Sequence, residues 1–553
     1  MKHQSTLNGY IYQSITDNWE MPSLTDFDGV SYSFKDLARK ITKLHIIFDR
    51  CGVRRGDKVA LCGRNSSQWS VAFLGAITYG AVAVPILNEF KPDNIHHLVN
   101  HSEAKLLFID REIWENLDSS NMPAIKGAIR LADFSLLFSR DENLDDVRAR
   151  LNEYFGMMFP ERFTSANFKV IADECADDVA LINYTSGSTG FSKGVMLTYR
   201  NLWSNLQFTI DKLTFLKAGD GVVSMLPMAH MYGLMVELLH PLVKGCHIHF
   251  LTRMPSPRVI MDAFARVHPK MIVSVPLIIE KIIKTKVFPL LDKPLMKILM
   301  HVPFVDDHLL AKIKQQLDAT FGGNLHEMII GGAALNKDVE EFLIRIGFPF
   351  TVGYGMTECA PLISYARHDE TKRGSCGRVV DRMTARIENP DENGVGVLWV
   401  KGDNVMKGYY KNSEATDACL KADGWLSTGD IGVLDDENFI FLRGRDKNMI
   451  LGPSGQNIYP EEIEQVLNNM PYVSESIVIS ENGRLVALIY PDYDLTSGAG
   501  MDETQIRKIM TDNIDQLNRE VPAYSKVSRF KLMSEEFEKT PKRSIKRYLY
   551  QLD

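Results

Sequence analysis

The sequence lacks the cysteine pattern of a disulfide-stabilised or zinc-binding protein. Its seven cysteines, at positions 51, 62, 175, 246, 359, 376 and 419, are odd in number, lie far apart and include no C-x-x-C pair. Neither a disulfide framework nor a zinc site is therefore predicted, and a reducing cytoplasm is the expected compartment.

Long apolar runs are absent as well, and neither sign of charge dominates. Met1–Glu20 contains no apolar segment of a secretion signal, and no later segment approaches the roughly 20 apolar residues that span a bilayer. The 63 Lys and Arg residues against 70 Asp and Glu residues leave a net charge of −7, with 24% charged and 45% hydrophobic residues. This composition predicts a soluble globular protein that binds no nucleic acid, and it leaves peripheral membrane contact open.

The sequence does contain an alternation of short β-branched runs and helical periodicity between Phe34 and Pro361. This pattern is typical of βαβ units around a mostly parallel sheet. The length of 553 residues corresponds to about three or four packed units. The predicted elements include a helix with Leu37, Ile41, Leu44 and Phe48 on one face that ends at Gly52, a buried strand Lys58–Cys62, a helix around Trp69–Tyr79 and a strand Ala81–Ile86.

Two segments of this region are less regular. Residues 112–161 are more charged and less periodic, and residues 287–304 are also irregular. We interpret both as insertions near the surface. After Gly374, short alternating runs with a turn at Asn393-Gly394 predict a small β subdomain.

The C-terminal part has the pattern of a compact α+β domain. Its predicted elements are strands near Ser476–Ile479 and Arg484–Tyr490 and a helix near Glu503–Arg519. We therefore expect a large domain over residues 1–445 and a smaller one over residues 446–553.

The most informative run is YTSGSTGFSKGV, residues 184–195, which follows the apolar strand Val179–Asn183. Small Gly, Ser and Thr residues let backbone N–H groups and hydroxyls approach polyphosphate oxygens, and the ammonium of Lys193 adds charge. The spacing is not that of a Walker A loop, because Lys193 is followed by Gly194. The run predicts a phosphate-binding loop that contains Thr185, Ser186, Gly187, Ser188, Thr189, Gly190 and Lys193.

This run resembles the phosphate-loop signature of the adenylate-forming, or AMP-binding, superfamily, which contains acyl-CoA synthetases, adenylation domains of peptide synthetases and beetle luciferases. Ser192 replaces the usual proline before the lysine. Further matches follow in the family's order from about Tyr10 to Arg547. The resemblance implies an α/β fold: a large N-terminal domain of two doubly wound α/β subdomains plus a small β-barrel-like subdomain, and a mobile α+β C-terminal domain.

Two further motifs are similar to nucleotide-binding motifs of this family. GGAAL at Gly331–Leu335 is similar to the family's GGAPL turn, and GYGMTE at Gly353–Glu358 is similar to its Y-G-x-T-E motif. A hard cation prefers carboxylate and phosphate oxygens, and it would offset the repulsion between a substrate carboxylate and a triphosphate. The resemblance implies that Gly332, Ala333, Gly355 and Met356 line the nucleotide site, that Tyr354 stacks on adenine, that Thr357 touches the α-phosphate and that Glu358 holds Mg²⁺.

The resemblance continues past the middle of the chain. Asp430, in GWLSTGDIG, matches the aspartate that accepts hydrogen bonds from both ribose hydroxyls, and a carboxylate is a natural bidentate acceptor for a cis-diol. Arg445 is implied to contact the same ribose or the phosphates. Lys447 matches the hinge about which the C-terminal domain rotates between half-reactions, and Gly455 matches a position beside the pantetheine tunnel of coenzyme A.

His230, in LPMAHMYG, resembles a motif residue that lines the acyl pocket of acyl and aryl ligases. A lone histidine among apolar residues is more often a satisfied core histidine, so both interpretations stay open. The run that follows, LMVELLHPLVKG, contains no aspartate where amino-acid-activating domains bind the substrate ammonium. This argues against an amino-acid substrate.

The tail departs from the family pattern. In EKTPKRSIKRYLY, Ser544 stands where the family has a lysine that binds the substrate carboxylate and the α-phosphate during adenylation. The neighbouring Lys542, Arg543 and Lys546 are candidates to replace it. Because losing one preorganised donor typically costs about 10²–10³ in rate, slow adenylation with a relatively intact thioester step is predicted.

Taken together, these motifs predict an ATP-dependent acyl-CoA synthetase that uses ATP, Mg²⁺ and coenzyme A. A long-chain fatty acid is the favoured substrate, because the tail resembles the ending of long-chain ligases and the pocket region lacks an ammonium-binding acid. Aryl or medium-chain acids, an acyl-carrier-protein thiol as acceptor, and a nucleotide or acyl-adenylate binder with little turnover remain alternatives.

Overall fold

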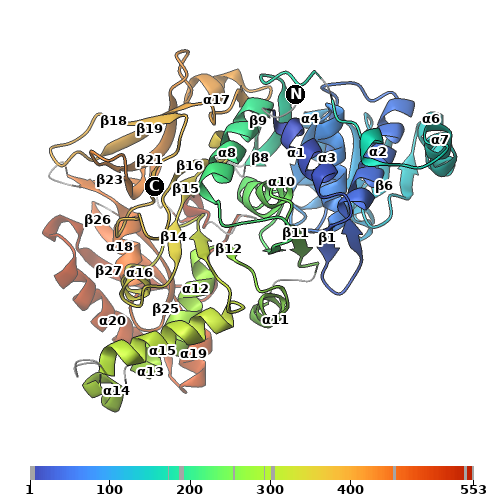
Figure 1. Cartoon of the computed structure of the whole chain (residues 1–553). Helices are drawn as coiled ribbons and strands as arrows, with labels where there is room; N and C mark the ends of the chain where they lie inside the picture. Colours follow the sequence, from blue (N-terminus) through green and yellow to red (C-terminus); the bar gives the residue numbers. More distant parts are fainter. Residues whose placement is uncertain are drawn as a thin grey trace.

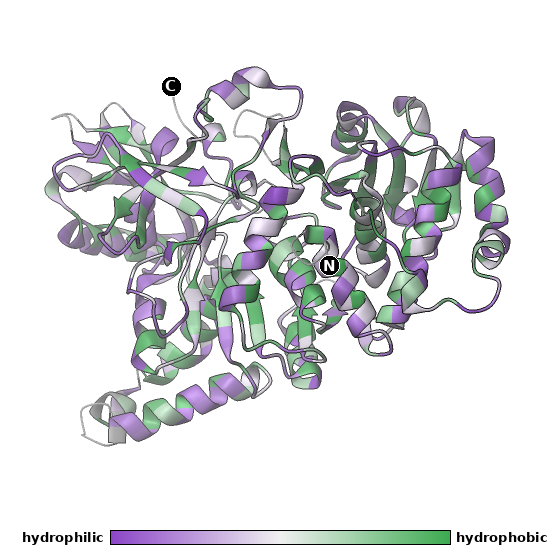
Figure 2. Cartoon of the chain, turned by 45° about the horizontal axis from the view of Figure 1, so that its top comes forward, coloured by the Kyte–Doolittle hydropathy of each residue, from purple (hydrophilic) through white to green (hydrophobic). Residues whose placement is uncertain are grey.

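The computed structural model describes residues 6–171, 173–185, 192–252, 256–291, 293–299, 305–452, 456–481, 483–540 and 545–550. The chain forms a large N-terminal part with several sheets and a C-terminal α+β domain, coloured orange to red in Figure 1. Apolar residues concentrate in the strands and on the inner faces of the helices (Figure 2). Among the described residues, no helix is both long and apolar enough to cross a membrane.

The first subdomain is built on an eight-stranded, mostly parallel sheet. Its central strands match the predicted βαβ pattern, and β3 has the predicted bounds. The helices α1 (Leu7–Asp17), α2 (Phe34–Arg50), α3 (Ser67–Tyr79), α4 (Pro92–Ser102) and α8 (Tyr199–Lys212) belong to it. The strand order is β20 (Gly408–Tyr409), β9 (Lys193–Thr198), β8 (Val179–Thr185), β4 (Val82–Ile86), β3 (Lys58–Cys62), β5 (Ala104–Ile109), β6 (Gly127–Arg130) and β7 (Leu136–Ser139).

The prediction that residues 112–161 form a surface insertion is wrong. This segment supplies β6 and β7 to the sheet, and its helices α6 (Glu142–Ala149) and α7 (Leu151–Met158) pack against α2. Ala128 and Ile129 in β6 are fully buried. Strands of four residues among charged neighbours are too short to show the alternation of apolar and polar residues that identifies a strand in a sequence. In the other irregular stretch, the described residues form two short helices, α13 (Phe288–Leu291) and α14 (Pro294–Leu299).

The second subdomain contains two neighbouring sheets. In both, the long-range strand pairs are parallel. An ion pair of 2.8 Å between Lys270 and Asp220 joins the ends of β12 and β10. The first sheet has the strand order β10 (Gly221–Ser224), β11 (His247–Phe250), β1 (Pro22–Asp26) and β2 (Ser31–Ser33). The second sheet has the order β12 (Met271–Ser274), β13 (Glu327–Ile330) and β14 (Phe350–Val352). The helices of this subdomain are α9 (Met231–Gly233), α10 (His240–Val243), α11 (Pro257–Val267), α12 (Pro276–Ile282), α15 (Val305–Thr320) and α16 (Lys337–Arg345).

The predicted β subdomain is present as an open antiparallel sheet. Asp391 organises the hairpin at Asn393-Gly394, since its Oδ1 accepts hydrogen bonds from the backbone of Asn393 and Val395 at 2.8 and 3.0 Å. Within the described residues the sheet does not close into a barrel. Its strand order is β18 (Met383–Glu388), β19 (Gly396–Gly402), β21 (Leu426–Leu434) and β22 (Ile440–Arg445). A smaller sheet contains β15 (Tyr354–Gly355), β16 (Leu362–Tyr365) and β17 (Arg378–Val379), and the helix of this region is α17 (Ser413–Asp417).

The C-terminal domain has an apolar core of its own. On α20, Ile506, Met510, Ile514 and Leu517 recur at helical spacing and join this core. None of the buried core residues of the N-terminal part belongs to it. The elements are β23 (Ile450–Leu451), β24 (Asn457–Ile458), α18 (Pro460–Leu467), β25 (Val473–Glu481), β26 (Arg484–Pro491), α19 (Tyr493–Gly498), α20 (Glu503–Glu520) and β27 (Val527–Leu532).

One buried acid makes stability depend on pH. Glu327, at the start of β13, is 2% exposed and accepts a hydrogen bond of 2.9 Å from the backbone N–H of His368. Burial raises the pKa of this carboxyl group to about 7. The native state therefore holds a proton that the unfolded chain releases near pH 4.5, so this group's contribution to stability falls as pH rises from about 4.5 to 7.

The Glu327→Gln variant is therefore expected to be more stable than wild type at pH 8, by roughly 1–3 kcal/mol, and about equally stable at pH 4.5. Urea unfolding at both pH values measures this difference. The exposed Glu112→Gln serves as control and should show no such difference. Equal stabilities of wild type and Glu327→Gln at pH 8 would contradict the assignment.

Candidate functional site

The phosphate-loop motif forms the end of a β-hairpin. Thr185 is the last residue of β8 and pairs with Lys193, the first residue of β9. The loop residues Ser186, Gly187, Ser188, Thr189 and Gly190 lie outside the described residues. The two described ends of the motif are thus held opposite each other in an antiparallel pair.

Tyr354, Asp430 and Arg445 meet although they come from three strands. The phenol of Tyr354 donates a hydrogen bond of 2.5 Å to Asp430 Oδ2, and Arg445 Nε lies 3.1 Å from Asp430 Oδ1. Strand pairing sets this geometry, because Asp430 in β21 is directly opposite Arg445 in β22. The sequence prediction that these residues share one site is consistent with this arrangement.

The Asp430 carboxylate is buried but still has acceptor capacity. It is 7% exposed, and burial raises its pKa, while Arg445 and the Tyr354 hydroxyl favour the charged form. A carboxylate offers about four lone-pair positions, and the protein uses two of them among the described residues. The remaining positions suit a pair of hydroxyl donors.

Gly355 allows the chain to turn tightly after Tyr354. A Cβ atom on Gly355 would lie 2.2 Å from the carbonyl oxygen of Pro361, so no other residue fits without moving the backbone. Met356 follows, and Thr357 and Glu358 begin a 3₁₀ turn, Thr357–Cys359, in which both side chains are largely buried.

Glu358 is the candidate metal ligand. Its Oε1 accepts a hydrogen bond of 2.9 Å from the hydroxyl of Tyr409, and no described residue donates to Oε2. No group of three or more His, Cys, Asp or Glu side chains that could hold a metal occurs in the described part of the chain. A single carboxylate with a spare oxygen fits Mg²⁺, which typically binds through one or two carboxylates together with substrate phosphates.

The GGAAL loop follows β13 and faces the His230 segment. Gly332 has a φ of +86°, which favours glycine, and Gly332 and Ala333 are exposed. Tyr232 reaches this region, since its hydroxyl donates a hydrogen bond of 3.0 Å to the carbonyl oxygen of Ile329. A Cβ atom added to Gly331 would lie only 3.2 Å from the same hydroxyl. His230 begins the short helix α9, where its Nδ1 accepts the N–H of Tyr232 at 3.2 Å. The structure thus gives His230 a capping role, and it is Tyr232, two residues later, that reaches the GGAAL loop.

A buried glutamate braces the loop before His230. Glu237 is fully buried in the π-helical segment Leu234–Leu239, and its Oε2 accepts the N–H groups of Met225 and Leu226 at 3.0 and 2.9 Å. Burial raises its pKa well above the usual range. Its Oε2 is therefore committed to the backbone, whereas its buried Oε1 has no hydrogen-bond partner among the described residues.

The hinge and tail residues are only partly described. Lys447 is exposed in a 3₁₀ turn, Asp446–Asn448, between β22 and β23. Gly455 and Ser544 lie outside the described residues, as do Lys542 and Arg543. Two basic tail residues are engaged elsewhere, since Lys546 pairs with Glu538 and Arg547 with Glu464.

The C-terminal domain contacts the GGAAL loop through polar groups. Gln465 Nε2 donates to the carbonyl oxygen of Leu335 at 3.0 Å, and Asn336 bonds to Asn469. Lys284 Nζ lies 3.3 Å from Asn469 Oδ1. In Figure 1, α18 lies beside α16, which begins just after Asn336.

Sequence reasoning missed several residues that support the site. Asn205, buried in α8, donates to the carbonyl of Cys359 at 3.0 Å and accepts the N–H of Leu362 at 2.9 Å, which fixes the turn that carries Glu358. Asn183, buried in β8, donates to the carbonyl of Ala229 at 2.8 Å, next to His230. An asparagine inside a helical or apolar run is the signal that could have found them, because a buried amide needs partners.

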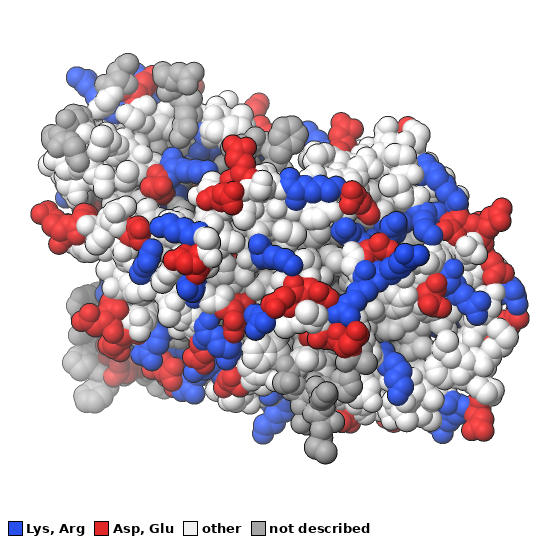
Figure 3. All heavy atoms as spheres, turned by 90° about the horizontal axis from the view of Figure 1, so that it is seen from above, with Lys and Arg blue, Asp and Glu red and all other residues white. Residues whose placement is uncertain are grey.

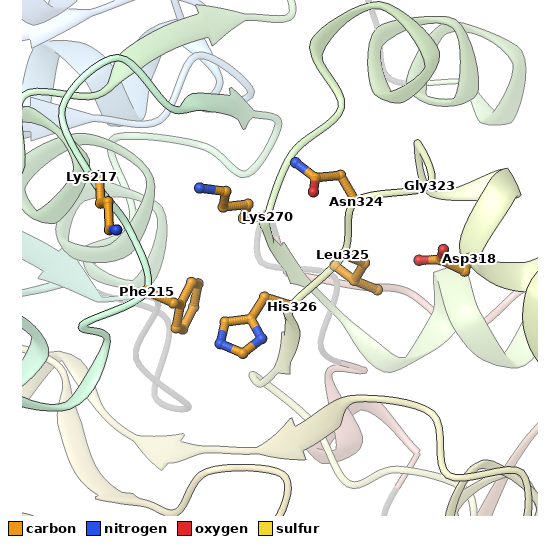
Figure 4. Close-up of a pocket in the computed structure, with 8 residues that line it drawn as sticks. All are labelled: Phe215, Lys217, Lys270, Asp318, Gly323, Asn324, Leu325 and His326. Carbon is orange, nitrogen blue, oxygen red and sulfur yellow. The ribbon is translucent and has the colours of Figure 1, made fainter.

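A surface cavity of about 510 Å³ lies elsewhere in the molecule (Figure 4). None of the residues that line this cavity is a candidate site residue. The lining residues of the cavity are Phe215, Lys217, Lys270, Asp318, Gly323, Asn324, Leu325 and His326.

On the face shown in Figure 3, basic and acidic side chains are interspersed, without a broad basic patch.

Comparison with known proteins shows the family of the chain. The model of the AMP-binding enzymes matches residues 13–410, and the model of the AMP-binding enzyme C-terminal domain matches residues 447–551. A long-chain-fatty-acid–CoA ligase of Escherichia coli is 30% identical over 445 residues, or 77% of this chain and 74% of that protein. 4-Coumarate–CoA ligase 3 of rice is 27% identical over 535 residues, or 92% and 86%.

The fold agrees with solved structures as well. The structure of ATP-bound MatB from Rhodopseudomonas palustris has a TM-score of 0.75 at 23% identity and covers 99% of this chain and 98% of its own. The motifs, the meeting of their residues in space and these matches lead to one conclusion: the chain belongs to the AMP-binding enzymes, the adenylate-forming superfamily that includes acid–CoA ligases.

Proposed function

We propose that the protein is an acyl-CoA synthetase that converts a long-chain fatty acid, ATP and coenzyme A into acyl-CoA, AMP and pyrophosphate. The observation that carries the proposal is the Tyr354–Asp430–Arg445 cluster, because it offers a ring for adenine, a carboxylate for ribose and a cation for the phosphates. Glu358, the candidate metal ligand, follows Tyr354 by four residues. The sequence match to a long-chain-fatty-acid–CoA ligase supports the substrate class.

The chain's residues would act mainly by positioning charge. Asp430 would accept the ribose hydroxyls, Thr185 and Thr357 would contact phosphate oxygens, and Lys193 would offset their charge. Glu358 would hold Mg²⁺, which neutralises phosphate charge when bound. Rate enhancement would then come from orientation and electrostatic stabilisation, because no protein nucleophile is required.

Two bond exchanges account for the reaction. In the first, an oxygen of the substrate carboxylate forms a bond to the α-phosphorus of ATP and the bond to pyrophosphate breaks. In the second, the sulfur of coenzyme A forms a bond to the acyl carbon, AMP leaves and the thiol proton is released. Lys447 would be the hinge between the two steps, Gly455 would line the thiol path, and His230 would line the acyl pocket.

The domain division and the compartment also belong to the proposal. We place the domain boundary between residues 445 and 446, and the enzyme in a reducing cytoplasm. All seven cysteines are free, which is consistent with that compartment. The favoured thiol acceptor is coenzyme A, and a carrier-protein thiol is the alternative.

The test is mass spectrometry of products after the purified protein is incubated with Mg·ATP, coenzyme A and a pooled series of short, long, aromatic and amino acids. Long-chain acyl-CoA together with equal AMP is the expected result. An aryl-CoA product would overturn the proposed substrate class and leave the proposed reaction unchanged. If no thioester forms and AMP appears only once per protein molecule, the chain is a binder of nucleotide or acyl-adenylate.

The role of Asp430 gives a specific prediction. Asp430→Asn is expected to raise the KM for ATP by about 10- to 100-fold, because hydrogen bonds to a charged acceptor contribute about 1.5–3 kcal/mol. The variant should also show a smaller preference for ATP over 2′-deoxy-ATP than the wild type shows. Acid-dependent pyrophosphate release with both nucleotides measures this, and the exposed Asp436→Asn is the control. An unchanged preference for ATP would exclude Asp430 as the ribose ligand.

A further inference from the structure

Tyr409 contacts two residues that the proposed function needs at the polyphosphate site, Glu358 and Lys193. Its hydroxyl donates a hydrogen bond of 2.9 Å to Glu358 Oε1. The ammonium of Lys193 lies 4.9 Å from the centre of the same ring, within the range of a cation–π interaction. Lys193 belongs to β9 and Glu358 to the turn Thr357–Cys359, so one side chain ties the two segments together.

The backbone around Tyr409 is fixed on both sides. Tyr409 pairs with Val195 in the antiparallel ladder of β20 and β9, and its N–H donates to the hydroxyl of Thr416 at 2.9 Å. Just before β20, the N–H of Met406 donates to the carbonyl oxygen of Glu358 at 2.8 Å. The strand is therefore held against both the lysine-bearing strand and the glutamate-bearing turn.

The phenol is suited to act only as a donor. Tyr409 is 9% exposed, and a carboxylate can only accept, so the phenol must donate its one proton to Glu358. The bond occupies Oε1 of Glu358, while Oε2 accepts no hydrogen bond from the described residues. Hydrogen bonds to the ligating carboxylate orient it toward a metal, and their loss typically costs 10- to 100-fold in metal affinity.

We propose that Tyr409 is a positioning residue of the ATP site: its hydroxyl orients Glu358 for a divalent cation and its ring supports the ammonium of Lys193. The inference rests on the proposed function, since it assumes that a metal-bound nucleotide occupies this site. A purely structural role would instead give a loss of stability without a selective change in metal binding.

The test uses two variants that separate the two contacts. Tyr409→Phe removes the hydroxyl and keeps the ring, whereas Tyr409→Leu removes both. Binding of Mn²⁺ in the presence of ATP is followed by electron paramagnetic resonance, and ATP binding without metal is followed by calorimetry in EDTA. Tyr409→Phe should weaken Mn²⁺ binding about 10- to 100-fold and leave metal-free ATP binding unchanged. Tyr409→Leu should weaken both.

The neighbouring tyrosine provides a matched control. The hydroxyl of Tyr410 also donates to a glutamate, Glu103, at 2.9 Å, but this pair lies at the surface, away from Glu358. Tyr410→Phe should therefore leave Mn²⁺ binding at the wild-type value. Mn²⁺ affinity of Tyr409→Phe equal to that of wild type would overturn the inference.

A double variant keeps the test decisive if Tyr409→Phe also lowers the unfolding temperature. When Glu358 is already replaced, in Glu358→Gln, adding Tyr409→Phe should weaken Mn²⁺ binding no further, because the hydroxyl acts through that carboxylate. An additional loss of tenfold or more in the double variant would contradict the inference. Failure of the proposed function would look different: wild type itself would release no pyrophosphate in response to any acid.

Discussion

Ser544→Lys is expected to accelerate acid-dependent pyrophosphate release by about 10²–10³, since it would restore a cation at the position where the resemblance places one. The thioester step, started from synthetic acyl-adenylate and coenzyme A, should change little. Stopped-flow measurement of pyrophosphate release and of thioester formation separates the two steps.

The neighbouring basic residues do not remove the need for this experiment. Lys546 is paired with Glu538, which holds its ammonium on the C-terminal domain. Ser497→Lys is a suitable control, because it adds the same charge at an exposed position of that domain. Pyrophosphate release that is equally fast in wild type and Ser544→Lys would show that another group already supplies the charge.

Glu358→Gln is expected to lower the rate of acyl-adenylate formation by about 10²–10³, because it removes a charged ligand from the site where phosphate charge must be neutralised. The side-chain shape is kept, and the amide oxygen can still accept the hydroxyl of Tyr409. The loss should therefore reflect charge and not packing.

Steady-state pyrophosphate release at several Mg²⁺ concentrations checks this prediction. A higher Mg²⁺ requirement together with a lower maximal rate is the expected result. The exposed Glu370→Gln is the control and should behave like wild type. A Glu358→Gln enzyme with the wild-type rate and Mg²⁺ requirement would rule out this glutamate as the metal ligand.

The elements with strong periodic signals could be predicted from the sequence, both in the N-terminal part and in the C-terminal domain. Lys58–Cys62 is a strand with the predicted bounds, and the predicted helix near Glu503–Arg519 is α20, Glu503–Glu520. The segment 112–161 could not be predicted, since its strands have only four residues each and β6 is buried by joining β5 near the edge of the sheet. Local patterns contain no information about such pairing.

The same distinction applies to the site. Motif residues such as Tyr354 and Asp430 are assigned to one site by resemblance, and in the structure their side chains meet in a hydrogen bond. Tyr409 could not, because its importance depends on β20 lying beside β9, more than 200 residues earlier in the chain. A tyrosine after a glycine has no special meaning until that pairing is known.

The polar contact between the C-terminal domain and the loop after β13 limits how firmly the two parts are held together. The contact with this loop consists of hydrogen bonds of Gln465, Asn469 and Lys284, and an exposed ion pair of 2.9 Å joins Arg443 of β22 to Glu462 of α18. No buried apolar cluster is shared between the two parts in the described residues. With about 0.5–1.5 kcal/mol per hydrogen bond and about 0–1 kcal/mol for the exposed ion pair, these polar contacts contribute roughly 2–5 kcal/mol.

A free-energy difference of this size lies within the range that one ligand can reverse. Shifting a two-state equilibrium from 1:99 to 99:1 requires about 5.5 kcal/mol of differential affinity. If the C-terminal domain turns between the two half-reactions as proposed, the binding of a nucleotide or the release of pyrophosphate would supply enough free energy to select its orientation. Breaking these polar contacts would then cost little enough to happen once in every turnover.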